Sequence, residues 1–519
     1  MSDESRRAGA GRGSVGLRTR LAYVGGVSAA MIAALAFAMS RADAFGQPST
    51  PQARQAQYLP AAPPQVQLSA DQVQLLQQAL NLADTHGFEP GEFAPPPGTE
   101  GLLRSSDAGA RQAGQAQLTA AVLRYAKAVH VGRLPDAAFL NDWGLRPAPY
   151  DPAADFARAV SQDQLKTWLD SLPPPYTGYD SLRQGLVAYR EIAARGGWPL
   201  VPAGPLLKPG VTDDRVIALR TRLAAEDPMV QPAGGPDYDD ALAQAVARAQ
   251  KRYGLMDDGI VNAATLAALN VPVGRRIDQI LANMERWRWL PPVLPTDRVQ
   301  VNIAAAILSV FHADTPVMSM RAVTGRPGDE TPMLQSRIES IVFNPPWNVP
   351  STIAAKELWP KQRANPGYFA AHDFVVVPTG DGGTRLQQRA GSMSALGKVK
   401  FDFANPYGVY LHDTPSRGLF SRYGRLASHG CVRLQKPLEL AKLLLQGDPT
   451  WTPDVIDSSI AAGKTVRAPL AQSIAVYLFY WTAYVGPDGA VNFREDPYGW
   501  DGVMADKLKA ADASGSAGV

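Results

Sequence analysis

The only cysteine of this 519-residue chain is surrounded in sequence by groups that support acid–base chemistry. It stands in the run Ser428-His429-Gly430-Cys431-Val432-Arg433, and an earlier run reads Tyr410-Leu411-His412-Asp413-Thr414. A thiol with the reference pKa of about 8.5 is mostly protonated at neutral pH, so a nucleophilic cysteine requires a nearby base or positive charge. His412 follows an apolar β-type run, and a side chain at a strand end can face a thiol across a loop. We therefore expect Cys431 to be a nucleophile and His412 its base.

Further members of these two runs are candidates for supporting roles. Gly430 lets the backbone approach a substrate closely, and the amides of Gly430 and Cys431 are candidate donors to a developing oxyanion. The planar guanidinium of Arg433 could bind a substrate carboxylate, although solvated loop charge is an equal alternative. His429 stays open as an alternative base. The arginines of the intervening loop are expected to be solvated; they are Arg417, Arg422 and Arg425.

Other uses of these residues are disfavoured by spacing. His372, His412, His429 and Cys431 offer zinc-type ligands, but structural zinc sites use paired short spacings and a second cysteine is absent from the sequence. We therefore expect neither a metal nor a cofactor. Papain-like proteases carry their cysteine near the mature N-terminus and their histidine far downstream, whereas here the histidine comes first. A buried, inert thiol is the remaining alternative.

The N-terminal sequence is typical of an export signal. Five arginines precede an uncharged apolar run from Leu21 to Met39, and Ala42-Asp43-Ala44 fits a small-x-small cleavage pattern. The run is also long enough for an uncleaved anchor in the inner membrane, and the sequence does not decide between the two. Positive-inside logic places the rest of the chain outside the cytoplasm. A lone cysteine in such a compartment cannot form an internal disulfide, which favours a reactive role.

Bulk composition fits a globular protein of two or three domains. The 51 Lys plus Arg residues and 48 Asp plus Glu residues leave a net charge of only +3, which gives no electrostatic reason to expect nucleic acid as a partner. Residues 45–67 are rich in Pro, Gln and Ala without apolar periodicity, which predicts a disordered linker.

Helical patterns predominate in the first half of the chain. Between Ser69 and Pro202 apolar residues recur at helical spacing, and Gly196-Gly197-Trp198-Pro199 ends this region. Two further apolar stripes and a short helix from Ala263 to Leu269 predict a three-helix unit after it. Gln250, Gly254-Leu255, Asp258-Gly259 and Thr265-Leu266 in that unit resemble the type 1 peptidoglycan-binding domain. A purely structural spacer is the alternative.

From about Thr296 short β-type runs replace the helices. They are Val299 to Ile303, Ile338 to Phe343, Phe374 to Val377 and Val409 to Leu411. Residues Val476 to Val485 and Ala490 to Phe493 flank a Pro-Asp-Gly turn and predict a hairpin, and the last dozen residues are expected to be disordered. The whole is a multidomain α+β fold.

The runs around the thiol closely resemble the catalytic pattern of the L,D-transpeptidase family (YkuD type). A wider resemblance, to its YcbB-type subfamily, covers roughly Leu76 to Asp496 and includes Asn344-Pro345-Pro346-Trp347-Asn348-Val349-Pro350. It implies a helical scaffold domain, a three-helix peptidoglycan-binding module and a mostly-β catalytic domain with a capping insertion. The expected bounds are 1–44 for the signal or anchor, 45–67 for the linker, 68–205 for the scaffold, 206–272 for the module, 296–500 for the catalytic domain, about 344–397 for its insertion, and 507–519 for the disordered tail.

The resemblance also implies a reaction. Cys431 would attack the third residue of a donor tetrapeptide stem of peptidoglycan and release D-alanine, and an amine of an acceptor stem would resolve the thioester into a 3→3 cross-link. The carbonyl of Asp413 would orient His412. Substrate-binding residues are expected at Arg433, Trp347, Tyr410 and Asn344, with packing beneath the insertion as an alternative for Trp347. Carbapenem-type β-lactams are expected inhibitors.

Two rival functions stay open. If water resolves the thioester, the same residues make an L,D-carboxypeptidase, and a third reading is a non-catalytic scaffold that binds the wall. The subfamily often has Pro-Gly-x-x-Asn-Ala-Leu-Gly where this chain has Ala390-Gly391-Ser392-Met393-Ser394-Ala395-Leu396-Gly397, which puts contacts to the donor in doubt.

Overall fold

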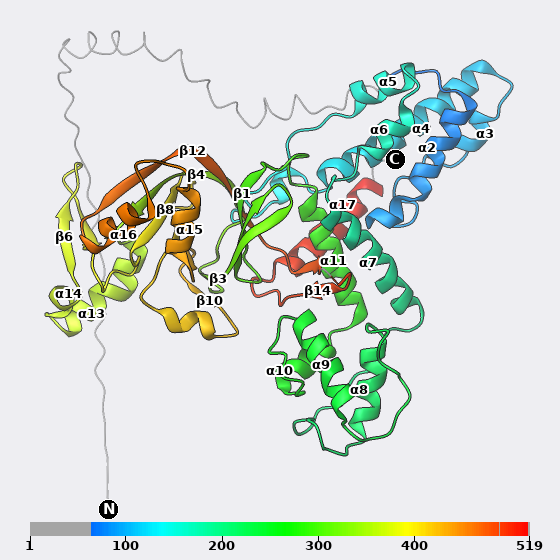
Figure 1. The fold of residues 1–519 in the computed structure, drawn as a ribbon. Helices are drawn as coiled ribbons and strands as arrows, with labels where there is room; N and C mark the ends of the chain where they lie inside the picture. Colours follow the sequence, from blue (N-terminus) through cyan, green and yellow to red (C-terminus); the bar gives the residue numbers. More distant parts are fainter. Residues whose placement is uncertain (1–63, 487, 517–519) are drawn as a thin grey trace, which may run out of the picture. The chain divides into compact units, whose positions relative to one another are not determined.

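The computed structural model describes residues 64–486 and 488–516 (Figure 1). The expected signal or anchor, and most of the expected linker, lie outside these residues. Within the described part of the chain, no helix combines the length and apolar character needed to cross a bilayer.

The N-terminal region is helical, as the apolar spacing predicts. Its elements are α2 (Ala70–Asn81), η1 (Ala83–His86), α3 (Thr99–Leu103), α4 (Ala108–Val131), η2 (Asp136–Ala138), α5 (Ala153–Ser161), α6 (Leu165–Asp170) and α7 (Thr177–Ala194). Helix α2 begins with a capping box, in which the Ser69 hydroxyl accepts from the Gln72 amide and the Gln72 side chain accepts from the Ser69 amide, both at 3.1 Å. The buried stripe of α4 includes Leu118, Val122 and Val129.

Three helices form the next module, namely α8 (Arg215–Ala224), α9 (Asp240–Arg252) and α10 (Ala263–Leu269), which lie together in Figure 1. The motif residues of this unit hold its fold. The fully buried Gln250 side chain donates to Asp258 Oδ1 and to the Ile260 carbonyl at 2.9 Å each, and accepts from the Gly259 amide at 2.8 Å. Gly259 has φ 70°, a left-handed conformation that glycine adopts without strain. These residues therefore fix the turn between α9 and α10.

Helix α11 (Val273–Trp287) follows the module and has a buried charge near its end. Glu285 is fully buried, accepts from the Arg133 amide at 2.8 Å and pairs with Arg288 at 2.9 Å. Because a buried carboxylate requires such partners, these contacts join α11 to the residues after α4. The expected domain bounds assigned α11 to no domain.

The catalytic region contains a nine-stranded sheet in the order β10-β3-β11-β9-β8-β4-β12-β1-β2. Its strands are β1 (Asp297–Asn302), β2 (Ile307–His312), β3 (Thr315–Gly325), β4 (Leu334–Phe343), β8 (Val399–Phe403), β9 (Leu411–His412), β10 (Leu426–Ser428), β11 (Val432–Leu434) and β12 (Val466–Phe479). Strand β2 pairs with both β1 and β3, so the sheet closes on itself. Helices η4 (Arg417–Ser421), α15 (Pro437–Leu444) and α16 (Pro453–Ala461) complete this part. The mostly-β prediction is confirmed.

A separate small subdomain is inserted between β4 and β8, where a capping insertion was expected. It consists of β5 (Trp347–Asn348), α12 (Ser351–Ile353), η3 (Ala354–Leu358), α13 (Trp359–Ala364), α14 (Tyr368–Ala371), β6 (Phe374–Pro378) and β7 (Thr384–Gln388). Its three strands form their own sheet in the order β5-β7-β6. Its buried residues also form their own cluster, which includes Val349, Leu358 and Phe374. The insertion thus has a core distinct from that of the catalytic sheet.

The C-terminal segment differs from expectation at its end. The predicted hairpin is present as β13 (Ala483–Val485) and β14 (Val491–Phe493), which pair antiparallel. Residues 507–516 were expected to be disordered, but they continue helix α17 (Trp500–Ser516). The start of α17 is held by Asp501, which pairs with Arg286 of α11 at 2.6 Å, and by buried Trp500 and Met504. This packing nucleates a helix that composition alone did not predict.

Candidate active site

Three neighbouring strands present the predicted catalytic residues on one face. In β8, β9 and β11 the residues Val399, Phe401, Leu411, Val432 and Leu434 are buried in the core of the sheet. Since side chains alternate along a strand, the intervening residues lie on the opposite face. Within the strands these are Lys400, Asp402, His412 and Arg433; Tyr410 and Cys431 immediately precede β9 and β11 and are partly buried against the core cluster.

The strand register orders these residues into two rows. Lys400 pairs with His412 across β8 and β9, and His412 pairs with Arg433 across β9 and β11, which gives the first row. Continuing each ladder by one residue sets Tyr410 between Asp402 and Cys431, which gives the second row. The base and the thiol therefore stand on adjacent strands and in adjacent rows.

The Cys431 side chain is partly exposed and its sulfur is held by Tyr410. Both the backbone amide and the hydroxyl of Tyr410 hydrogen-bond to the thiol, and the Trp347 side chain in turn hydrogen-bonds to the Tyr410 hydroxyl. Burial raises the pKa of the Cys431 thiol, while these hydrogen bonds and the charges of Lys400 and Arg433 act in the opposite direction. The resting nucleophile is therefore a thiol with donors already placed for its thiolate.

His412 is buried, with 4% of its surface exposed, and has a defined tautomer. Its Nδ1 lies 2.5 Å from the Asp413 carbonyl oxygen, which can only accept, so Nδ1 carries the proton and Nε2 is left as the basic nitrogen. Burial, and then the positive charge of Arg433, lowers the pKa of His412 to about 3. The imidazole is neutral at physiological pH and is able to accept a proton from a thiol.

The turn before the thiol is built around Gly430, which has φ 102°. This backbone conformation favours glycine, and an added Cβ would also make a tight contact of 3.2 Å with the Glu330 carbonyl oxygen. The Gly430 amide donates to Ser428 Oγ at 3.2 Å, and the Ser428 hydroxyl donates to the Cys431 carbonyl at 2.5 Å. The Gly430 amide, expected as an oxyanion donor, is therefore occupied in this conformation, which leaves the Cys431 amide as the candidate.

Arg433 lies next to His412 and Cys431 and has no carboxylate partner among residues 64–486 and 488–516. Its Nε is buried without a hydrogen-bond partner, and burial lowers the pKa of the guanidinium. Because Arg433 is only partly exposed and lacks a counter-charge, this geometry favours a role in binding an anion over solvated loop charge.

His429 points to the insertion. Its Nε2 lies 2.6 Å from Glu357 Oε1, and Arg326 approaches the same oxygen at 3.7 Å. Glu357 belongs to the π-helical turn η3, a type of distortion that is frequent at functional sites. The ring of His429 thus links the catalytic turn to the insertion, which argues against its use as the base.

Two residues expected to bind substrate differ in their placement. Trp347, at the start of the insertion, packs against the insertion core and also reaches the Tyr410 hydroxyl. Asn344 is 1% exposed, and its side-chain amide donates to the carbonyls of Ser459, Ile460 and Lys464. Asn344 therefore anchors the end of α16, and this placement favours a structural role over the expected contact with substrate.

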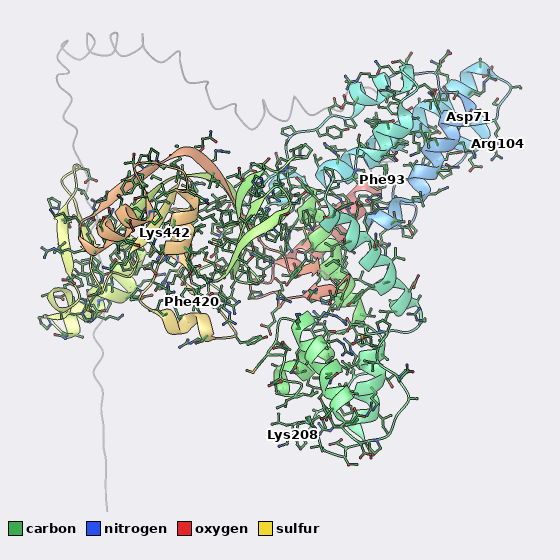
Figure 2. The ribbon with its side chains drawn as sticks, viewed as in Figure 1. Asp71, Phe93, Arg104, Lys208, Phe420 and Lys442 are labelled. Carbon is green, nitrogen blue, oxygen red and sulfur yellow. The ribbon has the colours of Figure 1, made fainter. Side chains whose placement is uncertain are left out.

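The loop between His412 and Cys431 is held by its own residues. Phe420, labelled in Figure 2, is buried, and the Arg417 guanidinium lies 5.1 Å from the centre of its ring. Arg417 also pairs with Asp413 at 3.3 Å, and Arg425 donates to the Ala305 carbonyl at 3.0 Å. These two arginines fix the loop and are not simply solvated.

A cavity of about 370 Å³ opens beside Tyr410. Its lining includes Lys400, Asp402 and Asn405 from the sheet region and Asn348 from the insertion. The sequence analysis missed Lys400, Asp402 and Glu357. The alternation Val399-Lys400-Phe401-Asp402-Phe403 was the available signal for the first two, since it predicts two charges on the outer face of a strand.

The zinc-type ligands considered earlier, all of them among the described residues, do not form a metal-binding group. His372 lies in the insertion, where Nδ1 is 2.8 Å from the Tyr368 carbonyl. No group of three His, Cys, Asp or Glu residues suited to a metal occurs in the part of the chain that the structure describes.

Comparisons with known proteins match three segments. Residues 296–452 match the L,D-transpeptidase catalytic domain family (YkuD), residues 65–186 match the family "Scaffold domain", and residues 212–269 match the "Putative peptidoglycan binding domain". A Haemophilus influenzae protein named "Putative L,D-transpeptidase" is 34% identical over 242 residues, which are 43% of this chain and 48% of that protein. The chain thus spans about half the length of this curated relative.

Solved structures similar to parts of the chain include two L,D-transpeptidases. The protein from Mycobacterium smegmatis is 15% identical over 36% of this chain and 58% of its own, with a TM-score of 0.19. The protein from Stackebrandtia nassauensis is 14% identical over 54% of this chain and 96% of its own, with a TM-score of 0.22.

Proposed function

We propose that this chain, whose residues 296–452 form an L,D-transpeptidase catalytic domain of the YkuD family, makes 3→3 cross-links in peptidoglycan through a thioester on Cys431. One observation carries the proposal. The thiol held by the Tyr410 hydroxyl immediately precedes β11, which pairs with the strand that carries the imidazole held by the Asp413 carbonyl, and Arg433, the strand partner of His412, has no carboxylate partner in the described part of the chain.

The first half-reaction acylates the enzyme. The Cys431 sulfur attacks the carbonyl carbon of the third residue of a donor tetrapeptide while His412 Nε2 accepts the thiol proton. The carbonyl oxygen becomes an oxyanion, which the Cys431 amide stabilises. When the intermediate collapses, the bond to the nitrogen of D-alanine breaks, and His412 returns the proton to that leaving amine.

The second half-reaction transfers the acyl group. The side-chain amine of an acceptor diamino acid attacks the thioester carbonyl, and His412 accepts a proton from the attacking amine. The carbon–sulfur bond then breaks, the new amide forms the cross-link, and the proton returns to Cys431. Attack by water instead would release a tripeptide and make the enzyme a carboxypeptidase.

The charges of the site suggest how substrate starts the reaction. Arg433 helps to keep His412 neutral, because a nearby cation disfavours an imidazolium. A substrate carboxylate bound to Arg433 would offset that charge. The bound substrate would then raise the proton affinity of the base when the thiol must be deprotonated.

The remaining domains fit an enzyme that acts on the wall. We propose that residues 206–272 bind peptidoglycan and that residues 68–205 carry the catalytic domain as a scaffold. The cell envelope, outside the cytoplasm, is the compartment where such a substrate occurs. The N-terminal segment that would direct the chain there, as signal or anchor, lies outside the described residues.

Mass spectrometry of the purified protein with a disaccharide-tetrapeptide tests the proposal. We expect an acyl adduct on Cys431 with loss of D-alanine, followed by dimers if an amine resolves it or by tripeptide if water does. Cys431→Ala should abolish both products while binding to peptidoglycan is retained. Unchanged dimers with Cys431→Ala would instead support a wall-binding scaffold, and full acylation by His412→Ala would refute His412 as the base.

Carbapenem-type β-lactams provide an independent probe. An Enterococcus faecium L,D-transpeptidase catalytic domain has been solved acylated by ertapenem. A carbapenem should likewise add its mass to Cys431 of this chain. Since opening the strained ring needs no amine acceptor, this reaction isolates the nucleophile from the transfer step.

A further inference from the structure

Strand β8, next to the strand that carries His412, has two oppositely charged side chains, Lys400 and Asp402. Lys400 Nζ lies 2.6 Å from Asp402 Oδ1, and the other oxygen of Asp402 pairs with Arg467 at 2.8 Å. The side chains of Lys400 and Asp402 are 24% and 22% exposed. Both line the cavity of about 370 Å³ beside Tyr410.

This pair lies close to the reacting groups. Lys400 is the strand partner of His412, and its Nζ is 4.4 Å from the centre of the Tyr410 ring. Tyr410 in turn holds the Cys431 thiol. An ordinary surface ion pair would be solvated and would contribute little. Here the two charges form one wall of a cavity whose neighbouring wall is the residue that holds the nucleophile.

We propose that Lys400 and Asp402 form a subsite for the zwitterionic end of a diamino-acid side chain, that is, a carboxylate and an ammonium on one carbon. The inference rests on the proposed function, and it names a recognition element of the substrate at that same site. Lys400 donates to the carboxylate and Asp402 accepts from the ammonium. A substrate side chain that ends in an amine without a carboxylate would give Lys400 no anion to bind.

When substrate binds, Lys400 and Asp402 would exchange their contact with each other for contacts with the substrate, and their surroundings allow this exchange. Arg467 holds one oxygen of Asp402, so the carboxylate keeps its place when Lys400 turns to a ligand. Lys400 is a point charge on a flexible stem and can follow the incoming anion. Because adjacent strands are about 4.8 Å apart, Lys400 and Arg433 stand roughly 10 Å apart on either side of His412. A stem peptide with two carboxylates could span the base between them.

Either stem could supply the zwitterionic group, so the experiment has two arms. In the donor arm, the rate of Cys431 acylation is measured with a tetrapeptide that contains diaminopimelate, and with the same peptide amidated at the side-chain carboxylate. In the acceptor arm, the donor is kept constant and dimer formation is measured with the corresponding tripeptides, which lack a fourth residue to release. In one arm the wild-type protein should prefer the free carboxylate by about tenfold, the effect of one charge-assisted hydrogen bond.

The decisive variant is Lys400→Gln, and its readout is the ratio of the two rates. We expect the ratio to fall towards one with Lys400→Gln and to persist with Lys400→Arg, which keeps the cation. A purely structural or general electrostatic role for Lys400 would change both rates together and leave the ratio unaltered. Lys442→Gln is the matched control, because Lys442 of α15, labelled in Figure 2, pairs with Asp457 of α16 at 2.8 Å.

The outcomes separate this subsite from the function on which it depends. A wild-type protein that is acylated, yet shows equal rates for free and amidated peptides in both arms, refutes the subsite alone. An unchanged ratio in Lys400→Gln refutes it as well. If neither tetrapeptide nor carbapenem modifies Cys431 of the wild-type protein, the proposed function itself fails.

Discussion

Replacing Tyr410 by Phe removes one hydroxyl and should weaken the nucleophile directly. That hydroxyl hydrogen-bonds to the Cys431 thiol, and the Trp347 side chain holds it in turn. A hydrogen bond to a charged group contributes about 1.5 to 3 kcal/mol, and each 1.4 kcal/mol is a factor of ten in an equilibrium. Because the bond favours the thiolate over the thiol, its loss should lower the thiolate population at neutral pH by about tenfold or more.

The rate of alkylation by iodoacetamide reports that population, since only the thiolate reacts. At pH 7.5 we expect Tyr410→Phe to be alkylated at Cys431 about tenfold more slowly than the wild-type protein, and its alkylation midpoint should move to higher pH. Tyr407→Phe is the matched control, because its hydroxyl donates instead to the Asn141 carbonyl at 2.7 Å. Equal alkylation profiles for Tyr410→Phe and the wild-type protein would refute this account of how the thiol is activated.

Other changes have equally definite outcomes. Because the pKa of His412 in the free protein is lowered to about 3, kcat/KM for acylation should stay level between pH 7 and pH 5, and a loss of kcat/KM centred near pH 6.5 would contradict a neutral base. The pKa of His86 is also lowered to about 3, so below pH 6.5 the unfolded chain binds a proton at His86 that the folded protein does not bind, and the free energy of unfolding falls. In urea titrations His86→Gln should reduce this fall by at most about 1.4 kcal/mol per pH unit. Glu357→Gln removes the carboxylate that contacts His429 and should speed amide hydrogen exchange in the insertion, but not in the sheet, by up to about fivefold. Asn344→Ala should cost about 2 to 3 kcal/mol of stability in chemical denaturation, since it unpairs buried carbonyls at a residue with φ 47°.

Much of the architecture was predictable because it depends on local patterns. Apolar spacing located α4, and short runs rich in β-branched residues located β1 and β4, since both signals are local in the sequence. The motif around Cys431 likewise pointed to the nucleophile and the base. Each of these inferences needs only residues that are near one another in the chain.

The rest depended on contacts between distant segments. Asn344 stands in a motif that suggested substrate binding, yet its partners come from the end of α16 more than a hundred residues later. Glu357 meets His429 only because the insertion folds back to the catalytic turn. The strand ladder that brings Lys400 beside His412 is also set by register, which the alternation of one strand does not reveal.

The segment after α4 has a consequence for dividing the protein into pieces. Leu134, Phe139, Trp143 and Leu145 belong to the same buried cluster as the catalytic sheet, and the amide of Gly144 donates to the Met333 carbonyl at 2.8 Å. A recombinant fragment that starts at residue 296 would leave a socket of aromatic and aliphatic surface open to water. Such a fragment, which also lacks Ala282, Trp289 and Leu290 of the same cluster, should aggregate or require detergent.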